Sequence, residues 1–141
     1  MLTTERKNTF LAILREELIP AMGCTEPIAL AYAAAKARAL LGTAPEHILA
    51  QCSGNMIKNV RCVQIPNSGG MIGIEAAVAL GAFGGDADKG MEVLESVTQT
   101  HRDQVRTFLR GKGCRVEYLD SDIPLHFIIT ETAGTDTVTV E

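Results

Sequence analysis

Residues 23–41 read GCTEPIALAYAAAKARALL, and this stretch predicts a helix over about residues 27–41 that determines how the domain packs. Pro27 fits the first helical turn, where the N–H group that proline lacks has no intrahelical partner. Thr25 fits as the N-cap, and Gly42 as the residue that stops the helix. Because alanine and leucine cover most sides of this helix, we expect it to be buried on most sides.

The flanking sequence predicts further helices on both sides of this central one. Apolar residues at helical spacing (Phe10, Leu11, Leu14, Leu18) predict an amphipathic helix over residues 4–19, which Pro20 ends. A small-residue helix is expected over residues 72–83. A longer one is expected over residues 88–110, where Leu94, Val97, Val105 and Phe108 would form a stripe facing the core.

Strand-like segments are separated by polar or glycine-containing turns. Strands are expected over residues 47–53, 60–65, 114–119, 125–131 and 135–140, with a turn or irregular crossing between the first two. This order of elements predicts a single α+β domain over residues 1–141, with Ala/Gly-rich helices packed on an antiparallel or mixed sheet. Because the last strand runs straight to Glu141, we expect the chain to be part of a larger protein.

Composition excludes several classes of function. The chain has 141 residues, 46% of them hydrophobic, which is enough for one domain with its own core. A net charge of −4 and the lack of a Lys/Arg cluster argue against nucleic-acid and anionic-membrane partners. No signal sequence or membrane-spanning run is visible, so the four cysteines indicate a reducing, cytoplasmic setting.

Cys24 is the strongest candidate for chemistry. It precedes the unpaired N–H groups and the positive end of the predicted helix, which both favour thiolate over thiol. Glu26 opposes this effect, since a nearby carboxylate disfavours a second negative charge. Cys24 can therefore be a reactive or metal-binding sulfur, or a buried structural cysteine. Glu26 can orient a substrate ammonium group or change the pKa of Cys24. It can also simply stabilise the N-terminus of the helix through its negative charge.

A second candidate site follows the first strand. Lys58 and Asn59, beside the turn that contains Asn55, could bind a carboxylate, or Lys58 could be a solvated surface residue. A pyridoxal phosphate Schiff base at Lys58 is disfavoured, because no phosphate-binding architecture accompanies it. The loop containing Asn67 and Gly69 could offer N–H groups to an anion, although close packing also explains its glycines.

The remaining cysteines and histidines are expected to be structural. Cys52, Cys62 and Cys114 fall in expected strands and are assigned to the core, where Cys52 and Cys62 could approach each other if their strands pair. The histidines show no metal-ligand spacing and are expected on the surface or in packing positions: His47, His101 and His126.

Three motifs in order carry a family resemblance. Gly23-Cys24-Thr25-Glu26-Pro27, then Ser53-Gly54-Asn55 with Lys58-Asn59, then Ile65-Pro66-Asn67 with Gly69-Gly70, resemble the UPF0597 family. That family includes the bacterial YhaM proteins and is related to L-cysteine desulfidase and iron–sulfur L-serine dehydratase. Its members are longer, so the chain resembles their N-terminal portion.

The resemblance implies a lyase that converts L-cysteine, or L-serine, to pyruvate and ammonia by α,β-elimination. It implies a [4Fe–4S] cluster in the full-length protein, with Cys24 as a ligand or as the general base. The other cluster cysteines would lie in a C-terminal catalytic region outside this chain. The isolated chain is therefore expected to bind no cluster and to be inactive, and a homo-oligomer is left open.

Two other hypotheses for the function of the chain are compatible with the sequence. In the first, the chain is a substrate-gating or interaction domain that contributes no chemistry. In the second, Cys24 is the nucleophile of a hydrolase and works with a distant histidine.

Overall fold

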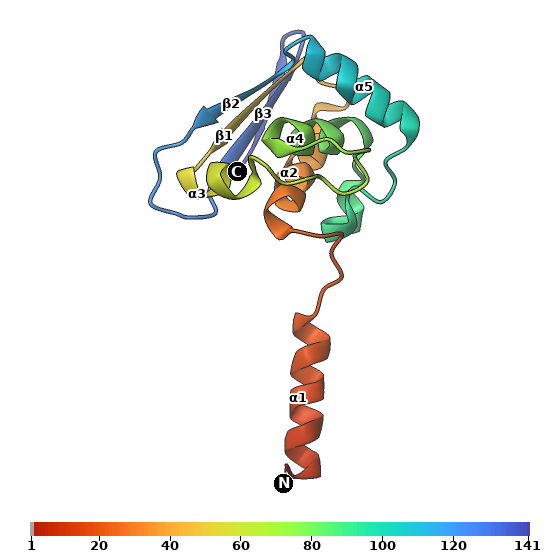
Figure 1. Ribbon diagram of the computed structural model, residues 1–141, viewed down its shortest axis with the longest axis vertical. Helices are drawn as coiled ribbons and strands as arrows, with labels where there is room; N and C mark the ends of the chain where they lie inside the picture. Colours follow the sequence, from red (N-terminus) through yellow and green to blue (C-terminus); the bar gives the residue numbers. More distant parts are fainter. Residues whose placement is uncertain (1) are drawn as a thin grey trace.

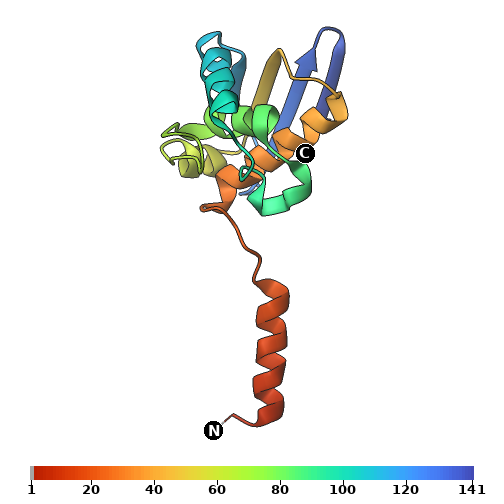
Figure 2. The same cartoon turned by 90° about the vertical axis from the view of Figure 1, so that its right-hand side faces the viewer.

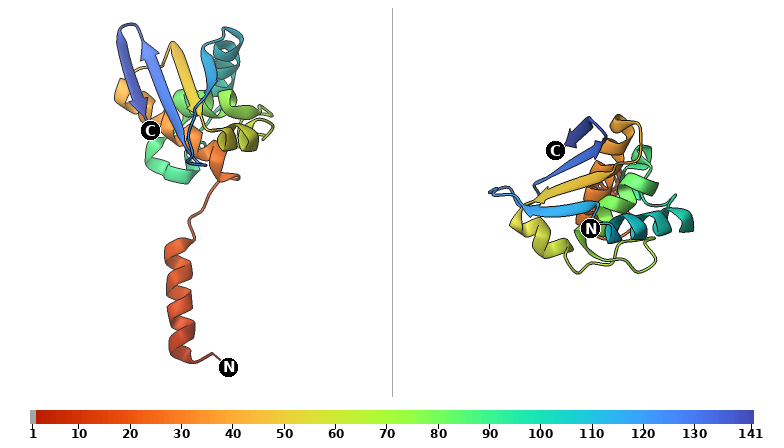
Figure 3. Two further views of the ribbon diagram at one scale, coloured as in Figure 1. Left: turned by 90° about the vertical axis from the view of Figure 1, so that its left-hand side faces the viewer. Right: turned by 90° about the horizontal axis from the view of Figure 1, so that it is seen from above.

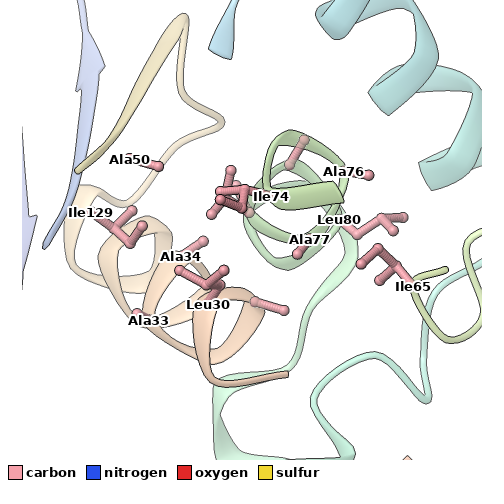
Figure 4. Packing of buried hydrophobic residues seen from close by; sticks show 14 of the residues in the cluster. Leu30, Ala33, Ala34, Ala50, Ile65, Ile74, Ala76, Ala77, Leu80 and Ile129 are labelled. Carbon is pink, nitrogen blue, oxygen red and sulfur yellow. The ribbon is translucent and has the colours of Figure 1, made fainter. Parts of the chain in front are cut away.

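Two small-residue helices pack against each other at the centre of the molecule. The computed structural model describes residues 2–141. In it, α2 (Thr25–Leu41) and α4 (Gly73–Gly84) contribute most of the buried alanines, and both are buried along most of their length. Figure 4 shows Ile74 on the side of α4 that faces α2, and Leu80 on the other side, pointing toward Ile65. The expected burial of the 27–41 helix is confirmed.

The two helices approach closely because Gly81 has no side chain. A Cβ atom at Gly81 would overlap the backbone of Ala31, including its carbonyl oxygen. Helices in globular proteins usually lie about 8–10 Å apart, and the shorter distances require small residues at the contact. The alanine and glycine content of the sequence therefore has a direct structural cause.

A four-stranded mixed sheet lies beside this helix pair (Figure 1). Its strands are β1 (His47–Cys52), β2 (Cys114–Tyr118), β3 (Phe127–Ala133) and β4 (Asp136–Val140), in the order β2-β1-β3-β4. β1 pairs parallel with β2 and antiparallel with β3, and β4 is antiparallel to β3. Figure 3 shows the helices on one face of the sheet. The predicted α+β fold is confirmed, with a mixed sheet.

The expected strand over residues 60–65 is wrong. Residues 54–60 form a short helix, α3 (Gly54–Val60), and after it only a single bridge joins Gln64 to Ile72. Ser53 starts α3, because its hydroxyl accepts a hydrogen bond from the Met56 N–H at 3.4 Å. The apolar residues that suggested a strand, including Val60 and Ile65, are buried but not paired in a sheet.

The expected helix over residues 88–110 is two elements. A 3-10 helix, η1 (Ala87–Glu92), contains Gly90 at a φ of 54°, which a continuing helix does not allow. The α-helix α5 (Gln99–Arg110) begins later, at an N-cap formed by Thr98 and completed by the side chain of His101. Leu94, Val97 and Val105 are nevertheless buried, so these core assignments are confirmed.

The first helix, α1 (Thr4–Glu17), stands away from the rest of the chain (Figures 1 and 2). It has no buried residue, and the side chains of Phe10, Leu11, Ile13 and Leu14 are 41–51% exposed. The helix exists as expected, but its apolar side has no partner among residues 2–141. Over the same residues, no helix is both long and apolar enough to cross a membrane.

Glu131 is an acidic residue inside the core. It lies on the buried face of β3, between Ile48 of β1 and Val138 of β4, and its exposed fraction is 0%. Neither carboxylate oxygen has a hydrogen-bond partner. Burial raises the pKa of Glu131 to about 8, although the positive charge of Arg38 opposes this shift. Glu131 is therefore mostly uncharged at neutral pH.

We predict that Glu131 makes the protein less stable as the pH rises. In the unfolded chain the carboxyl titrates near 4.5, whereas in the folded chain it titrates near 8. The folded state therefore binds the additional proton between these values, and its stability is complete below about pH 4.5 and falls until the pH passes about 8. Glu131→Gln should remove this slope, raising the unfolding free energy at pH 8 by a few kcal/mol.

Chemical denaturation at intervals from pH 5 to pH 9 measures this slope. Asp136→Asn serves as the control, because Asp136 is an exposed acid at the start of β4. A Glu131→Gln variant that keeps the wild-type pH slope would show that the carboxyl does not titrate in the folded core as described.

The contact between α2 and α4 gives a second prediction. Gly81→Ala should destabilise the domain by about 1–3 kcal/mol or more, because the new methyl group can be placed only by separating the two helices. Gly111→Ala is the matched control, since Gly111 has an ordinary φ of −75° and a Cβ there would be 3.4 Å from its nearest neighbour. Equal stability of the two variants, measured by urea denaturation, would contradict close packing at Gly81.

Candidate functional site

The three sequence motifs meet around Glu26. The Cys24 thiol donates a hydrogen bond to Oε2 of Glu26 at 3.0 Å, and the Asn59 amide donates to Oε1 at 3.4 Å. Gly23 lies against the ring of Pro66, where a Cβ would be 3.2 Å from Cγ. Segments that are 33 and 43 residues apart in the sequence are thus joined at the N-terminus of α2.

Cys24, not Thr25, is the N-cap of α2, which corrects the expectation for Thr25. Cys24 has extended backbone angles, and its side chain makes no capping hydrogen bond to the helix. The thiol instead bonds to the carboxylate two residues later. Gly23 turns the chain into this position with a φ of 136°, a value that favours glycine.

Glu26 decides the protonation state of the pair. The hydrogen bond to Glu26 raises the pKa of Cys24, and burial and the negative charge of Glu26 raise it further. Hydrogen bonds from backbone N–H groups lower this pKa, but by less, so the net shift is upward. The same hydrogen bond lowers the pKa of Glu26, and Asn59 adds to this effect. At neutral pH the pair is therefore a thiol donating to a carboxylate, with the proton held on sulfur.

A small apolar pocket opens beside this pair. Its volume is about 110 Å³, and Thr25 and Glu26 line it together with Ala29, Met56, Met91, Leu125 and Phe127. Sequence reasoning did not identify Met91, Leu125 or Phe127 as part of the site. These residues come from η1 and from the end of the chain, and no local spacing links them to residues 23–29.

The loop with Asn67 and Gly69 is tied to α5. The Asn67 amide donates to the carbonyls of Leu94 at 2.9 Å and Val97 at 3.0 Å, and its side-chain oxygen accepts from Arg102 at 3.0 Å. The Gly69 carbonyl accepts from Arg106 at 3.3 Å. The polar groups of Asn67 are therefore engaged in holding the loop, which reaches the site through Pro66.

The other predicted substrate-binding residues lie on α3. Asn55 and Asn59 are four residues apart and so share one face of this helix. Lys58 is exposed, and within residues 2–141 its ammonium group has no hydrogen bond or ion pair. Of the three residues, only Asn59 has a hydrogen bond to the Cys24–Glu26 pair.

The remaining cysteines differ in their exposure. Cys52 is buried in β1, and burial raises its pKa to about 11. Cys114 is half-buried in β2, with its pKa raised to about 12 for the same reason. Cys62 is exposed in the turn after α3, so its expected place in a core strand, paired with the strand of Cys52, is wrong.

The described residues supply only part of a metal site. Among residues 2–141, no group of three His, Cys, Asp or Glu side chains is placed to hold a metal ion. Cys24 is exposed and has an adjacent proton acceptor, so it fits as one sulfur ligand of a metal cluster. Further ligands would have to come from outside these residues.

The fold and the site define an α+β domain that presents a hydrogen-bonded cysteine–glutamate pair at the N-terminus of a buried helix. The chain is 44% identical over 140 residues to a UPF0597 protein of Treponema denticola, covering 99% of the chain and 32% of that protein. It is 48% identical over 123 residues to a UPF0597 protein of Desulfitobacterium hafniense, covering 87% of the chain and 29% of that protein. A third UPF0597 protein, from Fusobacterium nucleatum, is 47% identical over 131 residues, covering 93% of the chain and 31% of that protein.

These comparisons confirm the resemblance to the UPF0597 family that the three motifs predict. The chain spans about a third of the length of the curated relatives it matches. No family model and no solved structure matches it.

The Cys24–Glu26 pair gives a prediction on thiol reactivity. Glu26→Gln removes the negative charge that raises the pKa of Cys24, so Cys24 should react with iodoacetamide at pH 8 about two to ten times faster. Mass spectrometry of the modified peptides measures Cys24 separately, and the exposed Cys62 in the same sample is the internal control. An unchanged or slower rate at Cys24 would show that Glu26 does not hold the thiol protonated.

Proposed function

We propose that this chain forms part of the active site of an iron–sulfur-dependent lyase similar to L-cysteine desulfidase. The reaction would be α,β-elimination, which converts L-cysteine to pyruvate, ammonia and sulfide. The observation that supports the proposal is the exposed Cys24 thiol, hydrogen-bonded to the Glu26 carboxylate at 3.0 Å beside a small pocket. The isolated chain is proposed to be inactive, because its described residues lack a full set of cluster ligands.

One proposed role of Cys24 is that of a cluster ligand. A thiol must lose its proton before its sulfur can bind a metal, and the Glu26 carboxylate is placed to accept that proton. Asn59 holds the other oxygen of Glu26 and so fixes the direction of the carboxylate. A [4Fe–4S] cluster, when bound, would supply an open iron as a Lewis acid toward the substrate carboxylate and leaving group.

The other proposed role of Cys24 is that of the general base. After transfer of its proton to Glu26, the thiolate could take the α-proton of the substrate, and the two C–H electrons would form the Cα=Cβ bond. The Cβ–S electrons would leave with the sulfur as hydrosulfide, which could take up the proton from Glu26. The resulting enamine then takes up water and releases ammonia and pyruvate. Before this transfer, the negative charge of Glu26 suits the substrate ammonium group.

The pocket and α3 support a small amino acid as substrate. A volume of about 110 Å³ accommodates a short side chain such as that of cysteine or serine. Lys58, which has no ion pair within residues 2–141, and Asn55 are proposed to bind the α-carboxylate. Asn67 and Gly69 are proposed to position the Pro66 loop, since their polar groups already bind α5 and its flanking turn.

A substrate-gating or interaction domain is the second candidate. The observation that favours it is α1, whose apolar side chains have no partner among residues 2–141 and would suit a C-terminal catalytic region. A cysteine-nucleophile hydrolase has less support. Within the described residues the Cys24 side chain bonds to Glu26, not to a histidine, and its raised pKa reduces the thiolate fraction.

The test uses a full-length UPF0597 protein that carries these residues. It is reconstituted anaerobically with iron and sulfide, given L-cysteine, and assayed for pyruvate and bound iron. Cys24→Ser should lower both pyruvate formation and bound iron if Cys24 is a ligand, or pyruvate formation alone if it is the base. Cys62→Ser, an equally exposed cysteine, is the matched control and should change neither.

Two outcomes would contradict the lyase proposal. The first is a wild-type protein that stays colourless and makes no pyruvate after reconstitution. The second is normal turnover of the Cys24→Ser variant, which would instead favour the interaction domain.

A further inference from the structure

A second cavity lies at the opposite end of α2 from Cys24. Its volume is about 870 Å³, and it is formed by the C-terminal part of α2, the end of α4 and one side of α5. Arg38 lines it fourteen residues after Cys24, which places the two about 20 Å apart along the helix. The cavity is therefore separate from the candidate active site.

The cavity combines an aromatic floor with a rim that carries one cation, Arg38, and one acid, Asp103. Phe83 of α4 and Phe108 of α5 line it, and their ring centroids are 4.9 Å apart at an interplanar angle of 55°. A neighbouring cavity of about 420 Å³ shares Arg38, Ala82, Phe83 and His101 with it. A ligand bound here could place an apolar group on the rings and a polar group near Arg38.

The guanidinium group of Arg38 has no partner of its own. Within residues 2–141 it makes no hydrogen bond and no ion pair, although other arginines nearby do: Arg102 and Arg106. Glu131 is the acidic group whose pKa Arg38 lowers, but burial raises that pKa to about 8 and keeps the carboxyl mostly neutral at pH 7. Arg38 thus lines the cavity without an ion pair of its own within residues 2–141, while the acid in the same cavity, Asp103, is paired with Arg106.

His101 adds a donor on the same rim. Its Nδ1 atom accepts a hydrogen bond from the Thr98 backbone N–H at 3.3 Å, as part of the cap of α5. The neutral ring therefore carries its proton on Nε2, which is left to donate. The acid in the cavity, Asp103, already accepts hydrogen bonds from Gln99 and Arg106.

We propose that this cavity binds a small monocarboxylate with an apolar body. Its carboxylate would pair with Arg38 and accept a hydrogen bond from His101, while its body would lie on Phe83 and Phe108. One unpaired arginine matches one carboxylate, and a guanidinium can bind both of its oxygens. Because no described contact links the cavity to Cys24, this inference does not depend on the lyase proposal.

Phenylacetate is the probe, and isothermal titration calorimetry of this chain at pH 7 is the measurement. We expect saturable 1:1 binding, with Arg38→Gln raising the Kd at least about tenfold through loss of the charge-assisted bonds. Arg38→Lys should retain part of the affinity, because it keeps the charge but not the forked geometry. Lys36→Gln is the matched control, since Lys36 lines only the smaller cavity and should leave the Kd unchanged.

Two further ligands separate the parts of the proposal. 2-Phenylethanol, which lacks the carboxylate, should bind at least about tenfold more weakly than phenylacetate. Inorganic phosphate should compete poorly, because it cannot use the aromatic floor. A Cys24→Ser variant should bind phenylacetate as the wild type does.

Three outcomes would overturn the inference. They are no saturable phenylacetate binding, binding that Arg38→Gln leaves unchanged, and phosphate binding as tight as that of phenylacetate. Urea denaturation of each variant confirms that it is folded before it is titrated, and Arg38→Gln should fold normally because its side chain has no described partner to lose.

Discussion

The close contact between α2 and α4 at Gly81 is the constraint on which the rest of the structure depends. It brings two nearly apolar helices together as one layer, which then covers one face of the mixed sheet (Figure 3). The layer contains little aromatic bulk, since only 4% of the residues are aromatic. The core is therefore built from close backbone approach instead of large side chains, and it tolerates added volume poorly.

This packing also fixes where the chemistry lies. α2 is buried along its middle, so its two ends are the parts that reach the surface. At the first end Cys24 meets Glu26 and Asn59, and at the other end Arg38 lies between two cavities. A carboxylate holds the thiol protonated at one end, whereas the guanidinium group at the other end makes no ion pair within residues 2–141. The same helix thus carries two polar environments of opposite character.

The sequence predicted features that depend on neighbouring residues and missed those that depend on distant ones. Helix α2 and strands β1 to β4 follow from periodicity and from the Pro27 and Gly42 signals. The predicted strand over residues 60–65 is wrong, because the Ser53 cap favours a helix over residues 54–60. The predicted continuous helix over residues 88–110 is wrong, because Gly90 and the Thr98 cap divide it. In the site, the contact between Cys24 and Glu26 could be predicted because the two residues are two apart in the sequence. Met91 and Leu125 line the pocket only because tertiary packing places them there.

The seven residues from Leu18 to Cys24 connect α1 directly to the candidate site. Fully extended, they reach about 23–25 Å, so the end of α1 is tethered within that distance of Cys24, and the apolar residues of α1 as far as Phe10 lie up to about 10 Å further along the helix. A tether of this length raises the local concentration of the captured surface to roughly the millimolar range. A partner bound to α1 would therefore meet the Cys24 thiol at that effective concentration, even if its own affinity for the site is weak.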